Sequence, residues 1–279
     1  MAQPFIPKQV TTYQAEHLAE LQGDVSETVI EYFLTKVPTF QSGDVIHDNA
    51  CGAGAVLETI MASNPPKDIH IDATDVNENF VQACSAKAKE KHWPVKTQVM
   101  PSQALTFPDN YFTHSFTNFA FHCLGDHEAA AHHVYRTLRS GGTAVATVWI
   151  DMPHVDAMHH AHYLTRGRSG PMPTLMPEEN YKQSDLEASL VAGGFDKTNI
   201  SFSEKNAYLK IPDLARWSQL GWSYLGYLPE GWSKADEDNW EKAVKDIEDQ
   251  LKSGRGISKN EKGETVLKMV ACVAVARKE

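Results

Sequence analysis

The sequence predicts an α/β fold in which a seven-stranded, mostly parallel sheet ends in an antiparallel strand and carries a helical cap. Between residues 44 and 150, short apolar runs alternate with stretches at helical spacing, which is typical of a parallel sheet with crossover helices. The pattern changes beyond Asp151, where residues 151–183 are rich in His, Pro and Met without clear periodicity. Further helical stretches and a final apolar run follow, and these predict the cap and the last strand.

Each predicted strand is a short apolar or β-branched run bounded by turn residues. The first, Asp44–Asn49, leads into a turn that contains glycines, and the fifth, Thr143–Trp149, is rich in β-branched residues. We expect the sixth and seventh strands to form a hairpin at the end of the sheet. The seven strands are residues 44–49, 70–74, 97–100, 112–118, 143–149, a segment within 195–209, and 266–276.

Several of the predicted helices have recognisable ends. Asn77 is suited to cap a helix that runs to about Lys91, and Asp126 to cap one that ends at Gly141–Gly142. Pro212 favours the start of a helix in the cap. The other helices are predicted in pieces before residue 43, at 55–61, at 184–192, and from Ser233 onward, where Trp240, Val244, Ile247 and Leu251 share one face.

The length of the chain fits one large domain. With 279 residues it can bury a sizeable core, and its apolar and charged fractions are ordinary for a globular protein. We expect a single domain over residues 1–279, with a ligand-binding core at 44–150. Residues 1–43, 151–192 and 212–262 are expected to form the helical cap and insertions.

Composition excludes several kinds of partner. A net charge of −10 argues against nucleic acid, whose binding depends on Lys and Arg. No run approaches the roughly 20 apolar residues that a membrane helix needs, so no membrane partner is expected. The four cysteines form no CxxC pair, and the N-terminus resembles no signal or transit peptide. The prediction is a cytoplasmic protein with reduced thiols.

The turn after the first strand is the most informative segment. It reads Asp48-Asn49-Ala50-Cys51-Gly52-Ala53-Gly54-Ala55. Glycines here let the backbone turn sharply and let a ligand approach the main chain at the carboxyl edge of the sheet. Asp75 ends the second strand, where a carboxylate can accept hydrogen bonds from both hydroxyls of a ribose.

The glycine loop and the carboxylate together predict an adenosyl ligand. Enzymes that bind nicotinamide dinucleotides have the same two features, so these features do not distinguish the two cofactors. Three features favour S-adenosylmethionine. Leu57 replaces the third glycine of dinucleotide binders, the loop begins as late as residue 48, and the expected terminal hairpin is not required by a dinucleotide fold.

This part of the chain resembles the class I S-adenosylmethionine-dependent methyltransferases, which have a Rossmann-like fold. Asp48-x-x-x-Gly52-x-Gly54 is similar to their first motif, and Asp75 to their second-strand acid. The segments Ser102–Asp109 and Leu138–Gly142 resemble their adenine loop and the turn before their fifth strand. The resemblance covers about residues 44–150, with Gly193-Gly194-Phe195 as the entry to the sixth strand.

A narrower resemblance is to fungal secondary-metabolite methyltransferases such as the gliotoxin S-methyltransferase. It rests on the stretch from Asp48 to Val56, on Phe119-x-Phe121 and on the C-terminal cap. One departure is Pro101, which stands where the family often has an acidic or amide residue and has no N–H to offer an adenine.

The resemblance implies S-adenosylmethionine as cofactor and a small-molecule acceptor of the methyl group at sulfur, oxygen or nitrogen. Asn118 and Phe119 are expected beside the methionine part of the cofactor, and Tyr13 in the leading helix could close over it. The predicted cofactor-binding residues are Tyr13, Asp48, Asn49, Ala50, Gly52, Gly54, Asp75, Val76, Ser102, Gln103, Asn118 and Phe119.

His122 is the predicted general base, because an imidazole titrates near neutral pH and this one follows the fourth strand. A histidine that only hydrogen-bonds its own loop is the alternative. A thiolate acceptor would need no base.

The histidines between residues 154 and 162 suggest a metal site, with Asp151 and Asp156 nearby. The spacing argues against it, because Met158 stands four residues after His154 and the adjacent His159 and His160 would point apart. We therefore expect no metal, and a polar lining of the acceptor pocket instead.

Two other functions stay open at this point. One is a nicotinamide-dependent oxidoreductase. The other binds S-adenosylmethionine for a regulatory or non-methylating role. The sequence leaves the acceptor unidentified and allows either a monomer or a homodimer.

Overall fold

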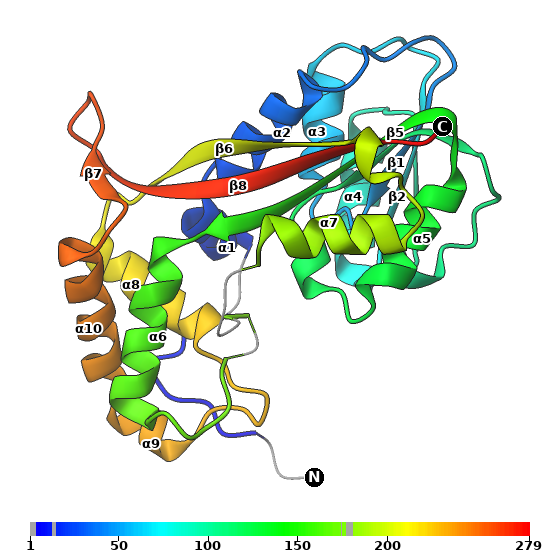
Figure 1. The fold of residues 1–279 in the computed structure, drawn as a ribbon. Helices are drawn as coiled ribbons and strands as arrows, with labels where there is room; N and C mark the ends of the chain where they lie inside the picture. The colour runs from blue at the N-terminus through cyan, green and yellow to red at the C-terminus, as the bar shows by residue number, and fades with distance from the viewer. Residues whose placement is uncertain (1–3, 13–14, 174, 177–180) are drawn as a thin grey trace. The chain divides into compact units, whose positions relative to one another are not determined.

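The computed structural model describes residues 4–12, 15–173, 175–176 and 181–279 (Figure 1). Contacts along the chain divide it into two compact units. Unit 1 comprises residues 1–25, 151–180 and 206–270, and unit 2 comprises residues 26–150, 181–205 and 271–279. Among the described residues, no helix is long and apolar enough to cross a membrane.

Unit 2 contains the parallel part of the sheet. Strand β1 pairs in parallel with β2 and β4, β2 pairs with β3, and β4 pairs with β5. These strands are β1 (Val45–Asn49), β2 (His70–Asp75), β3 (Val95–Val99), β4 (Phe112–Thr117) and β5 (Leu138–Asp151).

The sheet continues with β8 (Thr265–Arg277) and β6 (Ile200–Lys210), in the order β3-β2-β1-β4-β5-β8-β6. Strand β8 lies between β5 and β6 and runs opposite to both (Figure 1). The predicted mostly parallel sheet with an antiparallel last strand is confirmed. The strand count is corrected, because within the described chain β7 (Ile257–Lys259) pairs with β8 as an eighth, antiparallel strand.

The helices of unit 2 connect these strands. They are α2 (Val25–Leu34), α3 (Ala55–Ala62), α4 (Glu78–Glu90), α5 (His127–Thr137) and α7 (Gln183–Ala192), with short 3-10 turns η1 (Ser102–Ala104), η2 (Phe121–Cys123) and η3 (Lys197–Asn199). Two predicted caps are confirmed. The Asn77 side chain accepts a hydrogen bond from the Asn79 N–H at 3.0 Å, and the Asp126 carboxylate accepts one from the Ala129 N–H at 2.9 Å.

The start of β5 was misplaced by the sequence prediction. The pair Gly141–Gly142 does not end a helix, because α5 stops at Thr137 and the strand begins at Leu138. The Gly141 N–H donates to the Lys278 carbonyl at 2.7 Å, and the Lys278 N–H donates to the Gly142 carbonyl at 3.0 Å. These backbone hydrogen bonds to the end of the chain therefore make the two glycines part of strand β5.

Unit 1 is helical apart from its share of the long strands and β7. It contains α1 (Ala15–Gln22), α6 (Pro153–Arg166), α8 (Leu214–Leu225), α9 (Lys234–Asp238) and α10 (Trp240–Ser253). Helix α10 packs on α6 and α8 through Trp240, Ala243, Ile247 and Leu251. Residues 151–183 showed no periodicity in the sequence, but part of this segment forms helix α6. The periodicity was not visible because the buried face of α6 includes the polar residues His154 and His162.

The centre of β1 contains a buried histidine. His47 stacks on Phe112 with ring centroids 4.6 Å apart, and its Nε2 is hydrogen-bonded with the Thr74 hydroxyl at 2.9 Å. Burial lowers the pKa of His47 to about 3, because a charged imidazole would lose its hydration. His47 is therefore neutral at physiological pH and packs as an aromatic residue of the core.

Gly193 permits the close approach of α7 to α5. A Cβ atom at residue 193 would lie 2.5 Å from the Ala131 Cβ. Gly193→Ala should therefore lower the free energy of unfolding by about 1–3 kcal/mol through overpacking. Urea denaturation would measure the loss. Gly170→Ala is the control, because a Cβ there meets no described atom within 4 Å; an equal loss in both variants would contradict the packing argument.

Candidate functional site

The loop between β1 and α3 has an unusual backbone. Ala50, Gly52 and Gly54 all have positive φ angles, of 55°, 51° and 90°. This conformation costs a residue with a side chain roughly 1–2 kcal/mol, so glycine is expected here and Ala50 is strained. The Cys51 N–H donates to the Thr74 carbonyl at 2.9 Å, which holds the loop beside the end of β2.

The two glycines of the loop have different surroundings. A Cβ at Gly52 would meet no described atom within 4 Å, so this side of the loop is open for a ligand to approach the main chain. A Cβ at Gly54 would lie 2.8 Å from the Cys84 sulfur. Gly54 is thus required by packing against α4, whereas Gly52 leaves an open cradle.

Asp75 joins the loop to the second strand. One carboxylate oxygen accepts the Gly52 N–H at 2.9 Å, and the other accepts the Asn77 N–H at 2.8 Å. A carboxylate has about four acceptor positions, so two remain for the hydroxyls of a ribose. The sequence predicted this carboxylate, but it could not show that Asp75 also holds the glycine loop in place.

Two buried polar side chains lie under the loop. Asp48 Oδ2 and Asn49 Oδ1 have no hydrogen-bond partner within the described part of the chain. Asn49 donates through Nδ2 to the Thr117 hydroxyl at 3.0 Å. Burial raises the pKa of Asp48 to about 7, opposed by a hydrogen bond from the Leu57 N–H and assisted by the charge of Asp75.

Asp48→Asn should therefore stabilise the fold in a pH-dependent way. The folded-state pKa of Asp48 lies above the unfolded value of 3.8, so the contribution of Asp48 to stability falls as the pH rises from about 4 through 7. The variant should match the native chain near pH 4 and exceed it by roughly 4 kcal/mol above pH 7, at 1.36 kcal/mol per pKa unit. Urea unfolding across this range tests it; a constant difference would contradict the raised pKa.

The turn after β4 is also strained. Phe119 has φ 51°, and its N–H donates to the Thr147 hydroxyl at 2.9 Å. Its ring stacks on Trp149 with centroids 4.1 Å apart. The Asn118 Oδ1 accepts a hydrogen bond from the same Thr147 hydroxyl at 2.7 Å. Unusual backbone held by specific contacts is common at functional sites, which fits the roles predicted for Asn118 and Phe119.

The remaining predicted cofactor residues have varied settings. Ser102 is buried in η1, whereas Gln103 is exposed. Val76 is 71% exposed after the end of β2. Tyr13 lies outside the described residues.

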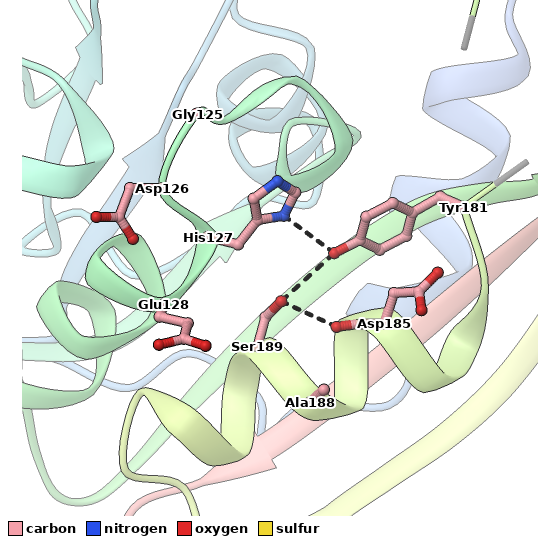
Figure 2. Close-up of a pocket in the computed structure, with 8 residues that line it drawn as sticks. All are labelled: Gly125, Asp126, His127, Glu128, Tyr181, Asp185, Ala188 and Ser189. Atoms are coloured by element: carbon pink, nitrogen blue, oxygen red, sulfur yellow. Dashed lines mark hydrogen bonds between the residues drawn. The ribbon is translucent and has the colours of Figure 1, made fainter. Parts of the chain in front are cut away.

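The predicted base lies near a cavity that the sequence did not reveal. This cavity has a volume of about 480 Å³ and lies between the start of α5 and α7, and Figure 2 shows the residues that line it. His127 Nδ1 is hydrogen-bonded with the Tyr181 hydroxyl at 3.1 Å, and that hydroxyl lies 3.4 Å from the Ser189 hydroxyl. Ser189 donates to the Asp185 carbonyl at 2.9 Å, so its oxygen is free to accept from Tyr181.

These contacts hold the His127 ring in place through its Nδ1 atom, at the start of α5. His122 lies close enough for the charge of His127 to lower its pKa, after burial as the larger cause. His122 Nδ1 is buried and has no hydrogen-bond partner in the described structure. His127 and Tyr181 are 54 positions apart in the sequence, so the sequence alone could not predict this cluster.

The histidines of α6 do not come together as metal ligands. His160 is exposed and its Nδ1 lies 2.6 Å from the Asp246 carboxylate, whereas His154 packs edge-on against Trp217. Asp151 and Asp156 both pair with Arg255. The described residues contain no group of three or more His, Cys, Asp or Glu side chains placed to hold a metal ion.

The chain is similar in sequence to known methyltransferases. Residues 47–146 match a family described as methyltransferase domain. Methyltransferase tpcH of Aspergillus fumigatus is 24% identical over 234 residues, which cover 79% of this chain and 82% of that protein. The acetylaranotin bis-thiomethyltransferase of Aspergillus terreus is 30% identical over 137 residues, covering 47% and 45% of the two chains.

The fold has counterparts among solved structures. A putative methyltransferase from Bacillus halodurans superposes with a TM-score of 0.59 at 15% identity, over 88% of this chain and 97% of that one. The matched residues 47–146 contain the glycine loop, Asp75 and the Asn118–Phe119 turn. Residues 47–146 are therefore a methyltransferase domain, within a Rossmann-like fold that the chain shares with the solved putative methyltransferase.

Proposed function

We propose that this enzyme transfers the methyl group of S-adenosylmethionine to a sulfur, oxygen or nitrogen atom of a small organic molecule of secondary metabolism. The observation that carries the proposal is the open cradle at Gly52, held by the Asp75 carboxylate. The fungal methyltransferases that resemble the chain over most of its length support a secondary metabolite as the acceptor. The negative net charge of −10 argues against nucleic acid as the acceptor.

The residues of the loop fit the proposed cofactor. Asp75 would accept hydrogen bonds from the ribose hydroxyls while it keeps its bonds to the Gly52 and Asn77 N–H groups. The orphaned oxygens of Asp48 and Asn49 offer acceptors beneath the loop. When bound, S-adenosylmethionine supplies an activated sulfonium methyl, so the protein has to orient the acceptor and exclude water.

The nature of the acceptor atom decides whether a base is needed. An alcohol, phenol or ammonium must lose a proton, and we propose His122 as its acceptor through the unpaired Nδ1. The lowered pKa of His122 keeps its ring neutral and able to accept that proton at physiological pH. The bis-thiomethyltransferase of Aspergillus terreus, by its name, methylates sulfur, which makes a thiol a candidate acceptor here as well.

Calorimetric titration with S-adenosylhomocysteine tests cofactor binding at the loop. Gly52→Ala should weaken binding about tenfold or more, because its Cβ enters the open cradle. Gly43→Ala is the matched control. Gly43 also has a positive φ, of 79°, and its Cβ would meet no described atom within 4 Å, but it precedes β1. Equal affinities in the two variants would contradict the proposed cradle.

A screen for methyl transfer to thiophenol, phenol and amine acceptors then tests catalysis. Transfer to at least one class is expected from the native chain. Tight cofactor binding without transfer to any acceptor would favour the regulatory or non-methylating role instead.

A further inference from the structure

The glycine loop carries one of two cysteines that touch. Cys51 lies in the loop and Cys84 on α4, and the two thiols are hydrogen-bonded with their sulfur atoms 3.6 Å apart. The Cys84 sulfur also lies 3.6 Å from the Gly52 carbonyl oxygen. Both side chains are buried, with 7% and 0% of their surface exposed. The methyltransferase chemistry proposed above uses neither thiol.

The positions of these sulfurs couple them to the cofactor cradle. Cys51 is held to β2 by its N–H bond to the Thr74 carbonyl, and the next residue, Gly52, donates its N–H to Asp75. Cys84 lies directly beneath Gly54, where an added Cβ would be 2.8 Å from its sulfur. A movement of either sulfur therefore changes the backbone on which the adenosyl group is proposed to lie.

A disulfide between these residues needs only a small movement. The sulfurs would have to approach by about 1.5 Å, from 3.6 Å to the bond length of roughly 2.05 Å. The positive φ angles of Ala50 and Gly52 flank Cys51, so the backbone on both sides of this thiol has an unusual conformation. All four cysteines are free thiols; Cys123 is exposed in η2 and Cys272 is buried in β8.

We propose that Cys51 and Cys84 form a dithiol modification site, at which a small organic disulfide produces a Cys51–Cys84 bond that weakens cofactor binding. The bond pulls the Cys51–Gly52 backbone toward α4 and disturbs the hydrogen bond from Gly52 to Asp75. In the reduced state the loop has the geometry described above.

The exchange balances in two steps. One cysteine thiolate attacks a sulfur of the small disulfide, which releases one thiol and leaves a mixed disulfide. The second cysteine then attacks the protein sulfur of that mixed disulfide and releases the second thiol. Two protein thiols are oxidised, one small disulfide is reduced to two thiols, and the protons of the two cysteines pass to the released thiolates.

The surroundings of Cys51 make this exchange slow at neutral pH. The pKa of its thiol is raised, because the hydrogen bond with Cys84, burial, and the charges of Asp48 and Asp75 all disfavour a thiolate. Oxidation should therefore accelerate as the pH rises. Bound cofactor should retard it, since it holds the loop in the reduced geometry.

The test oxidises the full chain with hydroxyethyl disulfide at pH 8.5, in a Cys123→Ser background that removes the exposed thiol. Peptide mapping without reductant should show the peptides of Cys51 and Cys84 linked. The linked form should bind S-adenosylhomocysteine at least fivefold more weakly than the reduced form, and added dithiothreitol should restore the affinity. S-adenosylhomocysteine present during oxidation should slow the linkage.

Two isosteric variants serve as controls. Cys51→Ser and Cys84→Ser keep the size of the side chain, and neither should show a change of affinity on exposure to the oxidant. The proposal is overturned if no linked peptide forms, or if the linked chain binds S-adenosylhomocysteine as tightly as the reduced chain. Binding by the reduced chain is measured in the same experiment, and its absence would count against the proposed function and not against the dithiol site.

Discussion

Replacing His122 with glutamine should slow methyl transfer to a phenol or alcohol acceptor by about 100-fold or more, the usual contribution of a positioned general base. Transfer to a thiol acceptor studied above its pKa should change little, because the thiolate brings no proton to remove. The affinity for S-adenosylhomocysteine should stay the same. Single-turnover rates with the two kinds of acceptor measure the difference.

The dependence of rate on pH gives a second readout. Burial and then the charge of His127 lower the pKa of His122, so the ring loses its proton at a lower pH than an ordinary histidine. The acidic limb of the rate profile for oxygen acceptors should therefore lie below pH 6.5 and disappear in His122→Gln.

Two further variants decide which imidazole acts. His127→Gln removes the ring that Tyr181 orients, and His132→Gln removes an exposed histidine elsewhere on α5. His132→Gln should be neutral. If the rate of methyl transfer falls greatly in His127→Gln and stays normal in His122→Gln, the general base is His127 and not His122.

Asp75→Ala should weaken the binding of S-adenosylhomocysteine by about 1–3 kcal/mol, or roughly 5- to 150-fold, the value of hydrogen bonds to a charged group. The upper end of this range is expected. The carboxylate would bind the ribose and also holds the Gly52 N–H at 2.9 Å, so its removal loosens the loop as well. Calorimetry measures the change directly.

The control for this variant is Glu78→Ala, which removes an exposed carboxylate from the first turn of α4. It changes the net charge equally and should leave the affinity within twofold of the native value, about the size of a surface effect. An unaltered affinity for S-adenosylhomocysteine in Asp75→Ala would show that this carboxylate does not bind the ribose.

The elements that sequence predicted well are those whose signals are local. Asn77 and Asp126 cap their helices because a cap depends on the next three residues. The start of β5 was missed because the Gly141 and Lys278 backbones pair across 137 positions of chain. Helix α6 was missed because His154 and His162 occupy its buried face, where apolar residues would have marked the period.

The same division applies to the candidate site. The glycine loop and Asp75 follow from motif spacing, since each lies at the end of a strand. Three contacts did not follow from it: the bond from Gly52 to Asp75, the touching thiols of Cys51 and Cys84, and the His127–Tyr181 pair. Each joins segments that only the packing of separate elements brings together.

Burial disfavours the charged forms of two neighbours on β1, which lowers the pKa of His47 to about 3 and raises that of Asp48 to about 7. As the pH falls below 6.5, the unfolded chain binds a proton at His47 but the folded chain does not, so His47 destabilises the fold. At Asp48 the folded chain binds a proton at higher pH than the unfolded chain, so Asp48 stabilises the fold. The two free-energy slopes have opposite signs between about pH 4 and 6.5 and largely cancel. Mild acidification should therefore change the combined contribution of these two residues to the free energy of unfolding very little.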